Sequence, residues 1–191
     1  MNVRIFKTTN TIYETFKTLL REKNFDKISV NEICKKSLIS KSTFYAHFAD
    51  KYDLLEHFSD KTTSILEEII RRRFKAMDYQ NPFSILDKIA NDTVSQNKDI
   101  QLLLKLNSPE FQFEKSLQQI LYKNCFKWLE KSNKKLKFTK DFTALLYSNI
   151  ALSSIKFSLE ISEKEPEYLK NHIAFISSMQ NPILGTIFLS E

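Results

Sequence analysis

Glycine is almost absent from this chain, because Gly185 is the single glycine among 191 residues. Phosphate-cradling loops, dinucleotide-binding turns and the sharp turns that carry catalytic nucleophiles need glycine where the backbone bends tightly or approaches a ligand. The sequence therefore argues against most nucleotide-binding enzymes and the common hydrolases. No pair of a nucleophile and a base stands out either, so we expect a protein that is not an enzyme.

The composition indicates a folded chain with enough apolar material for a core. Hydrophobic residues make up 42% of the sequence and include 16 Phe and 7 Tyr, which argues against disorder. A net charge of +6 suits an anionic partner without proving one. Two cysteines, Cys34 and Cys125, are too few for a disulfide framework, so we expect a reducing, cytoplasmic setting.

Membrane and metal partners are not expected. The first ten residues lack the apolar centre of a signal peptide, and the uncharged stretch over residues 142–155 is too short to span a bilayer. His47, His57 and His172 stand apart from cysteines and carboxylates at ligand spacing, so we expect no metal ion and no other cofactor.

Apolar residues recur at helical spacing along nearly the whole chain, and no segment alternates as a strand would. This pattern predicts an all-α fold of about nine helices. The expected helices cover about residues 8–23, a short segment after Ser29, another after Ser40, then from Asp50 to 71–73, 82–96, 100–106, 109–132, 139–162, and a last segment from Pro166.

Several helix starts carry local capping signals. Ser29 and Glu32 have the spacing of a capping box, in which the hydroxyl accepts from a free backbone N–H and the carboxylate reaches back to the cap. Ser40, Asp50 and Thr139 place an oxygen at the start of the third, fourth and long late helices. Three short helices, with a tight break at residues 37–39 between the second and third, predict a helix-turn-helix.

Three motifs in the first sixty residues support this prediction: Val30-x-x-Ile33, the run Ser40-Lys41-Ser42-Thr43-Phe44-Tyr45-Ala46-His47-Phe48, and Asp50-Lys51-Tyr52-Asp53-Leu54-Leu55. With them the chain resembles the TetR/AcrR family of bacterial transcription regulators, and residues 52–55 resemble the dihydroxyacetone-operon subgroup. Leu38 departs from the family pattern, which has glycine in the turn. A left-handed backbone would cost a leucine there about 1–2 kcal/mol, so the turn either tolerates this strain or shifts slightly.

The resemblance implies a DNA-binding domain over residues 1–53 that inserts its third helix into the major groove. Phe44 and Phe48 would be core residues. The implied DNA-binding residues are Ser29, His47 and Lys51 on phosphates, Lys41, Ser42 and Thr43 on base edges, Tyr45 on the backbone or a thymine methyl, and Ser40 at the helix start. The alternative for each is an ordinary cap or a solvated side chain, and their joint spacing favours DNA.

The resemblance also implies that residues 54–191 form a helical domain for effector binding and dimerisation. The expected pocket residues are Phe74, Phe83, Leu103, Leu121, Cys125, Trp128 and Tyr147, and the alternative for each is ordinary core. The expected dimer-interface residues are Phe142, Leu146, Asn149, Ile150, Ser153 and Phe157, and the alternative is a helix buried within one subunit.

The function implied is a ligand-responsive repressor that binds a palindromic operator as a homodimer and responds to a small-molecule effector. Two recognition helices one turn of DNA apart, about 34–36 Å, would read such a site. One alternative keeps the fold but acts as a coactivator or interaction subunit through a protein partner. A remote alternative is a small helical enzyme.

Overall fold

The computed structural model describes residues 3–76, 98–106, 112–132 and 135–164, together with positions 168, 171, 174, 175 and 178. These residues contain seven α-helices, one 3-10 helix and no β-strand, which confirms the all-α prediction. The elements are α1 Val3–Glu22, η1 Phe25–Lys27, α2 Val30–Ser37, α3 Lys41–Tyr45, α4 Lys51–Ala76, α6 Lys98–Lys105, α7 Phe113–Lys131 and α8 Lys140–Lys164. The helix expected over 82–96 lies outside the described residues, as does most of the segment expected from Pro166.

The chain divides into two compact units. The head unit comprises Met1–Thr62 and Asp99–Phe111, and the body unit comprises Thr63–Lys98 and Gln112–Glu191. α4 is one continuous helix whose first half belongs to the head unit and whose second half belongs to the body unit.

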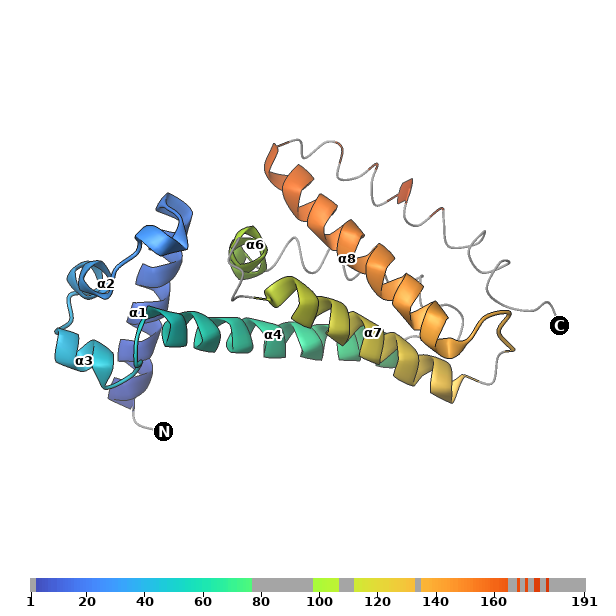
Figure 1. Ribbon diagram of the computed structural model, residues 1–191, viewed down its shortest axis with the longest axis horizontal. Coiled ribbons are helices and arrows are strands. Elements are labelled where there is room, and N and C mark those ends of the chain that lie inside the picture. The colour runs from blue at the N-terminus through green and yellow to red at the C-terminus, as the bar shows by residue number, and fades with distance from the viewer. Residues whose placement is uncertain are drawn as a thin grey trace. The chain divides into compact units, whose positions relative to one another are not determined.

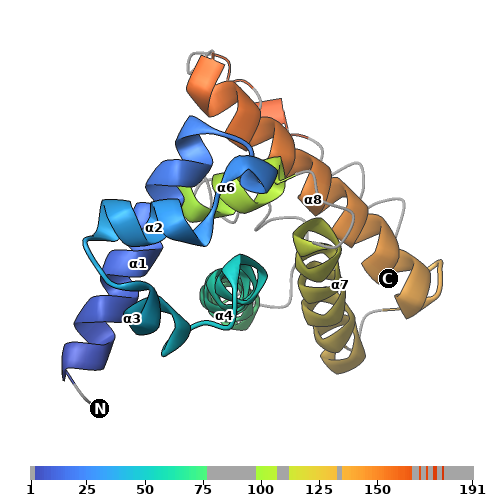
Figure 2. The ribbon, with the colours of Figure 1, turned by 60° about the vertical axis from the view of Figure 1, so that its left-hand side comes forward.

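The head unit is built on α1, which begins at Val3, about five residues before the expected start. Its apolar stripe, Ile12, Phe16 and Leu19, is fully buried. Phe16 meets Phe58 of α4 edge to face, with ring centroids 6.2 Å apart. Aromatic pairs of this kind add about 0.5–1.5 kcal/mol to the energy of burial, so the core fixes α1 against the start of α4 beneath α2 and α3 (Figure 2).

The short helix α6 also belongs to the head unit, although it lies far from α1 in sequence. Ile100 and Leu103 of α6 are buried. The Lys17 ammonium of α1 pairs with the Asp99 carboxylate at 3.2 Å, which ties two segments 82 residues apart.

The body unit contains α7 and α8, which run antiparallel (Figure 1). Leu117 and Leu121 of α7 and Ala144 and Ala151 of α8 are fully buried. Small alanines let two helix backbones approach closely, and each fully buried leucine stabilises the fold by about 1.5–3 kcal/mol. None of the described helices is long and apolar enough to cross a membrane.

Candidate nucleic-acid interface

The start of α2 is fixed by the predicted capping box. Ser29 has extended backbone angles, and its Oγ accepts from the Glu32 N–H at 3.2 Å. The pKa of Glu32 lies below its usual range, chiefly because its carboxylate accepts from the Lys23 ammonium at 2.6 Å. The hydroxyl arm of the box is therefore present, and it holds the first turn of α2.

The turn after α2 holds a strained leucine. Leu38 has φ 55° and ψ 40°, in the left-handed region, and it is the one residue with positive φ in the described part of the chain. Its N–H donates to the carbonyls of Cys34 and Lys35, which closes the helix. The turn thus keeps the left-handed form in which the family has glycine, and the side chain is 92% exposed.

The start of α3 gathers small polar side chains. Ser40 Oγ accepts from the Thr43 N–H at 3.0 Å and lies 2.8 Å from both the Ser42 and the Thr43 hydroxyls. Lys41 is exposed beside them. An ammonium, free hydroxyl hydrogen-bonding capacity and the positive end of a helix are the groups that bind phosphates and base edges.

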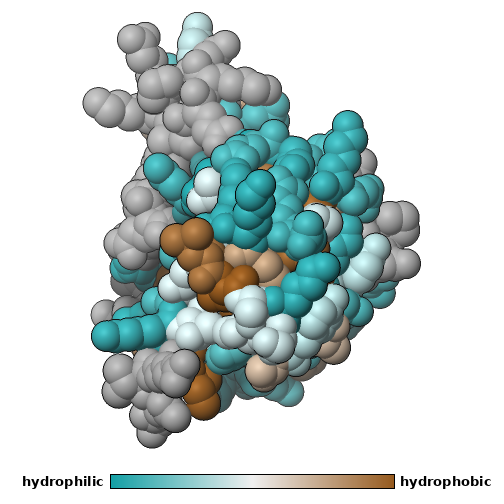
Figure 3. Space-filling model, turned by 90° about the vertical axis from the view of Figure 1, so that its left-hand side faces the viewer, coloured by the Kyte–Doolittle hydropathy of each residue, from teal (hydrophilic) through white to brown (hydrophobic). Residues whose placement is uncertain are grey.

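The two faces of α3 differ as the sequence predicts. Phe44 is fully buried and Phe48 is 4% exposed, with ring centroids 5.8 Å apart. Tyr45 is 55% exposed and touches the Phe44 ring edge to face at 5.6 Å. Figure 3, which looks at the end of the molecule where α2 and α3 lie, shows a hydrophilic surface around a small apolar patch. Leu38 is the most exposed large apolar residue among those described.

The two remaining residues expected to bind DNA, His47 and Lys51, hydrogen-bond within the head unit. His47 Nδ1 lies 3.2 Å from the Thr9 hydroxyl of α1, so the ring is held at the end of α3 with a half-buried side chain. The Lys51 ammonium, at the start of α4, donates to backbone carbonyls near Phe25. Sequence reasoning missed Thr9 and these carbonyls, because no local pattern indicates a partner more than twenty residues away.

The expected pocket residues of the body unit are buried, and several adjoin one another. Phe74 and Tyr147 meet with ring centroids 5.6 Å apart. Burial raises the pKa of the Tyr147 phenol well above its usual value, and the nearby Cys125 adds to this. Trp128 Nε1 is buried with no hydrogen-bond acceptor in the part of the chain that the structure describes. Leu121 is fully buried.

Two expected pocket residues are placed differently. Leu103 is buried on α6, which the structure assigns to the head unit. Phe83 lies outside the described residues. Among the residues that can be described, no three His, Cys, Asp or Glu side chains lie together in a group that could hold a metal ion.

The expected dimer residues lie on one side of α8. Phe142 and Phe157 are each 48% exposed. Between them, Asn149 and Ser153 are exposed, and Leu146 and Ile150 are half-buried. Asn149 Oδ1 accepts from Gln118 Nε2 of α7 at 2.9 Å. The stripe therefore borders α7 at Asn149, while Phe142 and Phe157 remain about half exposed.

The fold and the site together define a helical protein with an N-terminal helix-turn-helix. Residues 10–61 match the family model of the bacterial regulatory proteins of the TetR family. Over 117 residues the chain is 26% identical to the uncharacterised HTH-type transcriptional regulator YvdT of Bacillus subtilis (strain 168). This alignment covers 59% of this chain and 58% of that relative.

Solved structures share the fold over most of the chain. A TetR-family regulator from Syntrophomonas wolfei has a TM-score of 0.69 at 19% identity, with 93% of this chain and 94% of that one covered. A regulator from Aquifex aeolicus VF5 has a TM-score of 0.65 at 23% identity, with 92% and 99% covered. The SmeT–triclosan complex has a TM-score of 0.68 at 12% identity, with 96% and 93% covered.

Residues 10–61 of this chain therefore form a helix-turn-helix DNA-binding domain of the TetR family. The subgroup expected from residues 52–55 stays a prediction.

Proposed function

We propose that the protein is a transcription regulator in the cytoplasm that binds a palindromic DNA site as a homodimer and releases it when a small molecule enters the body unit. The observation that carries the DNA part is the start of α3. Lys41, Ser42 and Tyr45 are exposed there while Phe44 anchors the same helix in the core. A recognition helix needs this division, because base edges are read only by side chains that the core does not use.

The roles proposed within the interface are those that the family resemblance implies, and the chemistry of the side chains supports them. The start of α2 at Ser29 offers oriented N–H groups to a phosphate. In this proposal Lys41, Ser42 and Thr43 meet base edges, and the Tyr45 ring covers the sugar-phosphate backbone or a thymine methyl. His47 has one ring nitrogen engaged by Thr9, which leaves the other for a phosphate oxygen. Ser40 acts as the cap that orients this set.

The experiment is selection of bound duplexes from a random pool, followed by titration of the selected duplex and a scrambled one. We expect a palindromic consensus with half-sites one helical turn apart. Tyr45→Ala should weaken binding to both duplexes, whereas Lys41→Ala should also reduce preference for the selected one. Lys140→Ala, which removes an exposed charge from α8, is the matched control. Absence of any sequence preference in the wild-type protein would refute the proposal.

The dimer part rests on the stripe along α8. An exposed apolar face with a small residue at Ser153 suits close contact with a second copy. Ser153→Arg should separate the dimer without disturbing the fold of one subunit, because Ser153 is exposed there. Gln119→Arg, an equal change at an exposed position of α7, is the control. Equilibrium sedimentation measures both, and a dimer unaffected by Ser153→Arg would exclude this interface.

The effector part rests on the buried cluster of Phe74, Cys125, Trp128 and Tyr147. An apolar molecule with one hydrogen-bond acceptor would suit it, because the Trp128 N–H is buried without an acceptor among the described residues. SmeT, a structural neighbour, is known in complex with triclosan, so apolar phenols are the first molecules to test here. Trp128 is the single tryptophan, and its fluorescence should change in parallel with DNA release.

A further inference from the structure

The Lys51 ammonium is enclosed by backbone carbonyls. Nζ lies 3.2 Å from the Phe25 oxygen, 3.1 Å from the Asp26 oxygen and 3.0 Å from the Ile28 oxygen. It also lies 4.6 Å from the centroid of the Phe25 ring and 5.4 Å from that of Tyr52. A lysine ammonium has three N–H donors, so these three carbonyls use its full capacity.

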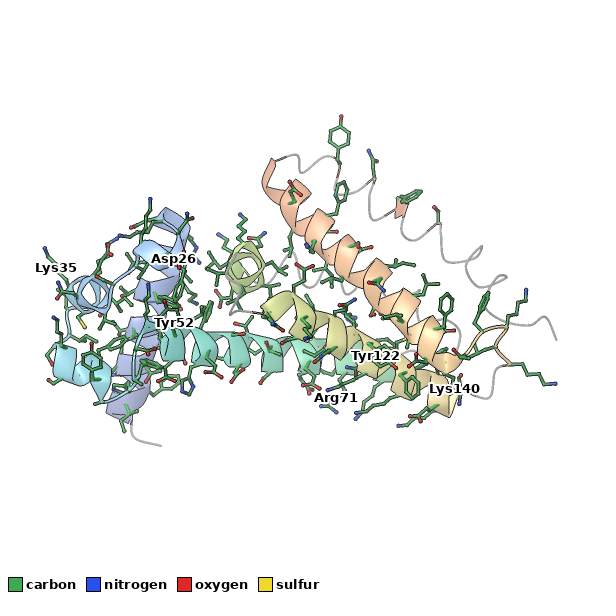
Figure 4. The ribbon with its side chains drawn as sticks, in the orientation of Figure 1. Asp26, Lys35, Tyr52, Arg71, Tyr122 and Lys140 are labelled. Atoms are coloured by element: carbon green, nitrogen blue, oxygen red, sulfur yellow. The ribbon has the colours of Figure 1, made fainter. Side chains whose placement is uncertain are left out.

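The three carbonyls belong to the segment that leads into α2. Phe25 and Asp26 form the 3-10 helix η1, and Ile28 directly precedes Ser29, the α2 cap. Asp26 and Tyr52, labelled in Figure 4, mark the two segments that Lys51 joins. The ammonium therefore holds the backbone immediately before the helix end that the proposed function places on a phosphate.

The start of α4, which carries Lys51, is itself held by hydrogen bonds. Asp50 Oδ1 accepts from the N–H groups of Tyr52 and Asp53 at 2.8 and 2.9 Å, and the Asp53 carboxylate accepts from the Ala49 N–H at 2.7 Å. These reciprocal caps hold the start of α4. Lys51 thus transmits the position of α4 to the start of α2.

We infer that Lys51 is a positioning residue, which sets the start of α2 for DNA through the carbonyls of Phe25, Asp26 and Ile28 and does not itself hold a phosphate. A phosphate oxygen could reach this ammonium only by displacing one of the three carbonyls. This inference rests on DNA binding by the head, and it replaces the phosphate contact that the family resemblance implies for Lys51.

Two substitutions separate the alternatives. Lys51→Met keeps the aliphatic stem and removes the donors. Lys51→Arg keeps the charge, but its flat guanidinium cannot point three donors at one small group of carbonyls. If Lys51 contacted a phosphate, arginine would restore the DNA affinity. If Lys51 positions the start of α2, arginine would not restore it.

The first measurement is the salt dependence of affinity for the duplex selected with the wild-type protein. Each phosphate contact contributes about 0.9 to the slope of log affinity against log salt. We expect Lys51→Met and Lys51→Arg to lower affinity by a similar factor, about tenfold, and to leave the slope unchanged. Lys41→Met, the control at the exposed lysine assigned to base edges, should instead reduce the preference for the selected duplex over the scrambled one.

The second measurement needs no DNA, and its first part needs only the wild-type protein. In the wild-type protein, nitrogen-15 NMR of the lysine ammonium groups should show Lys51 with slowly exchanging protons. In both variants, hydrogen exchange at the Glu32 and Ile33 amides, which donate to Ser29, should accelerate.

Three results would overturn the inference. They are a slope reduced by about 0.9 in Lys51→Met and restored in Lys51→Arg, unchanged amide exchange at Glu32 in both variants, or coupling of the Lys51 nitrogen to a DNA phosphorus. A wild-type protein that binds no duplex would refute the proposed function instead. The exchange data on the free protein would still decide whether Lys51 positions α2.

Discussion

Leu38→Gly is expected to stabilise the protein. Leu38 is held at φ 55° and ψ 40°, where a side chain with a Cβ costs about 1–2 kcal/mol relative to glycine. The extra freedom of glycine in the unfolded chain opposes this gain by about 0.5–1 kcal/mol. Since the leucine is 92% exposed, its removal sacrifices almost no burial. The net gain is therefore about 0.75 kcal/mol at the centre of the two ranges, and the melting temperature should be about 1.5–3 °C higher for a chain of this size.

The assay is urea or thermal unfolding followed by circular dichroism. Leu38→Ala is the matched control, because it removes the same exposed side chain but keeps the Cβ that causes the strain, and it should leave the melting temperature within about 1 °C of wild type. A glycine variant no more stable than the alanine variant would show that the left-handed turn carries no cost here, and the reasoning from φ would fail.

Three further predictions concern Glu32, Phe44 and the two cysteines. The pKa of Glu32 is lowered in the folded chain, so its charge adds stability above its usual pKa, and this stability is lost as pH falls through the lowered value. In Glu32→Gln the free energy of unfolding should therefore fall less steeply at acid pH. An unchanged pH dependence would contradict this prediction. Phe44→Ala should cost about 3–5 kcal/mol, because Phe44 is fully buried; chemical denaturation measures this, and a loss below 1 kcal/mol would argue against its core role. Burial raises the pKa of both the Cys34 and Cys125 thiols, so a thiol reagent should react with neither in the native protein and with both in denaturant; rapid native labelling would contradict this.

Features that depend on a few neighbouring residues could be predicted from the sequence. The caps at Ser29, Ser40 and Thr139 are confirmed, each with a hydroxyl that accepts from an N–H three residues later. The division of the α3 motif into a buried Phe44 and an exposed Tyr45 is confirmed as well. The start of α1 was less predictable, because residues 3–7 carry no capping signal, and the helix begins at Val3.

The sequence by itself determined the described helices and the caps at Ser29, Ser40 and Thr139, because hydrophobic period and capping act over three or four residues. The tertiary structure alone decided which partners the polar side chains take. Lys51 reaches carbonyls 23 to 26 residues away, and His47 meets Thr9 across 38 residues. Such pairs form only once the core has brought distant segments together, so no local sequence pattern predicts them.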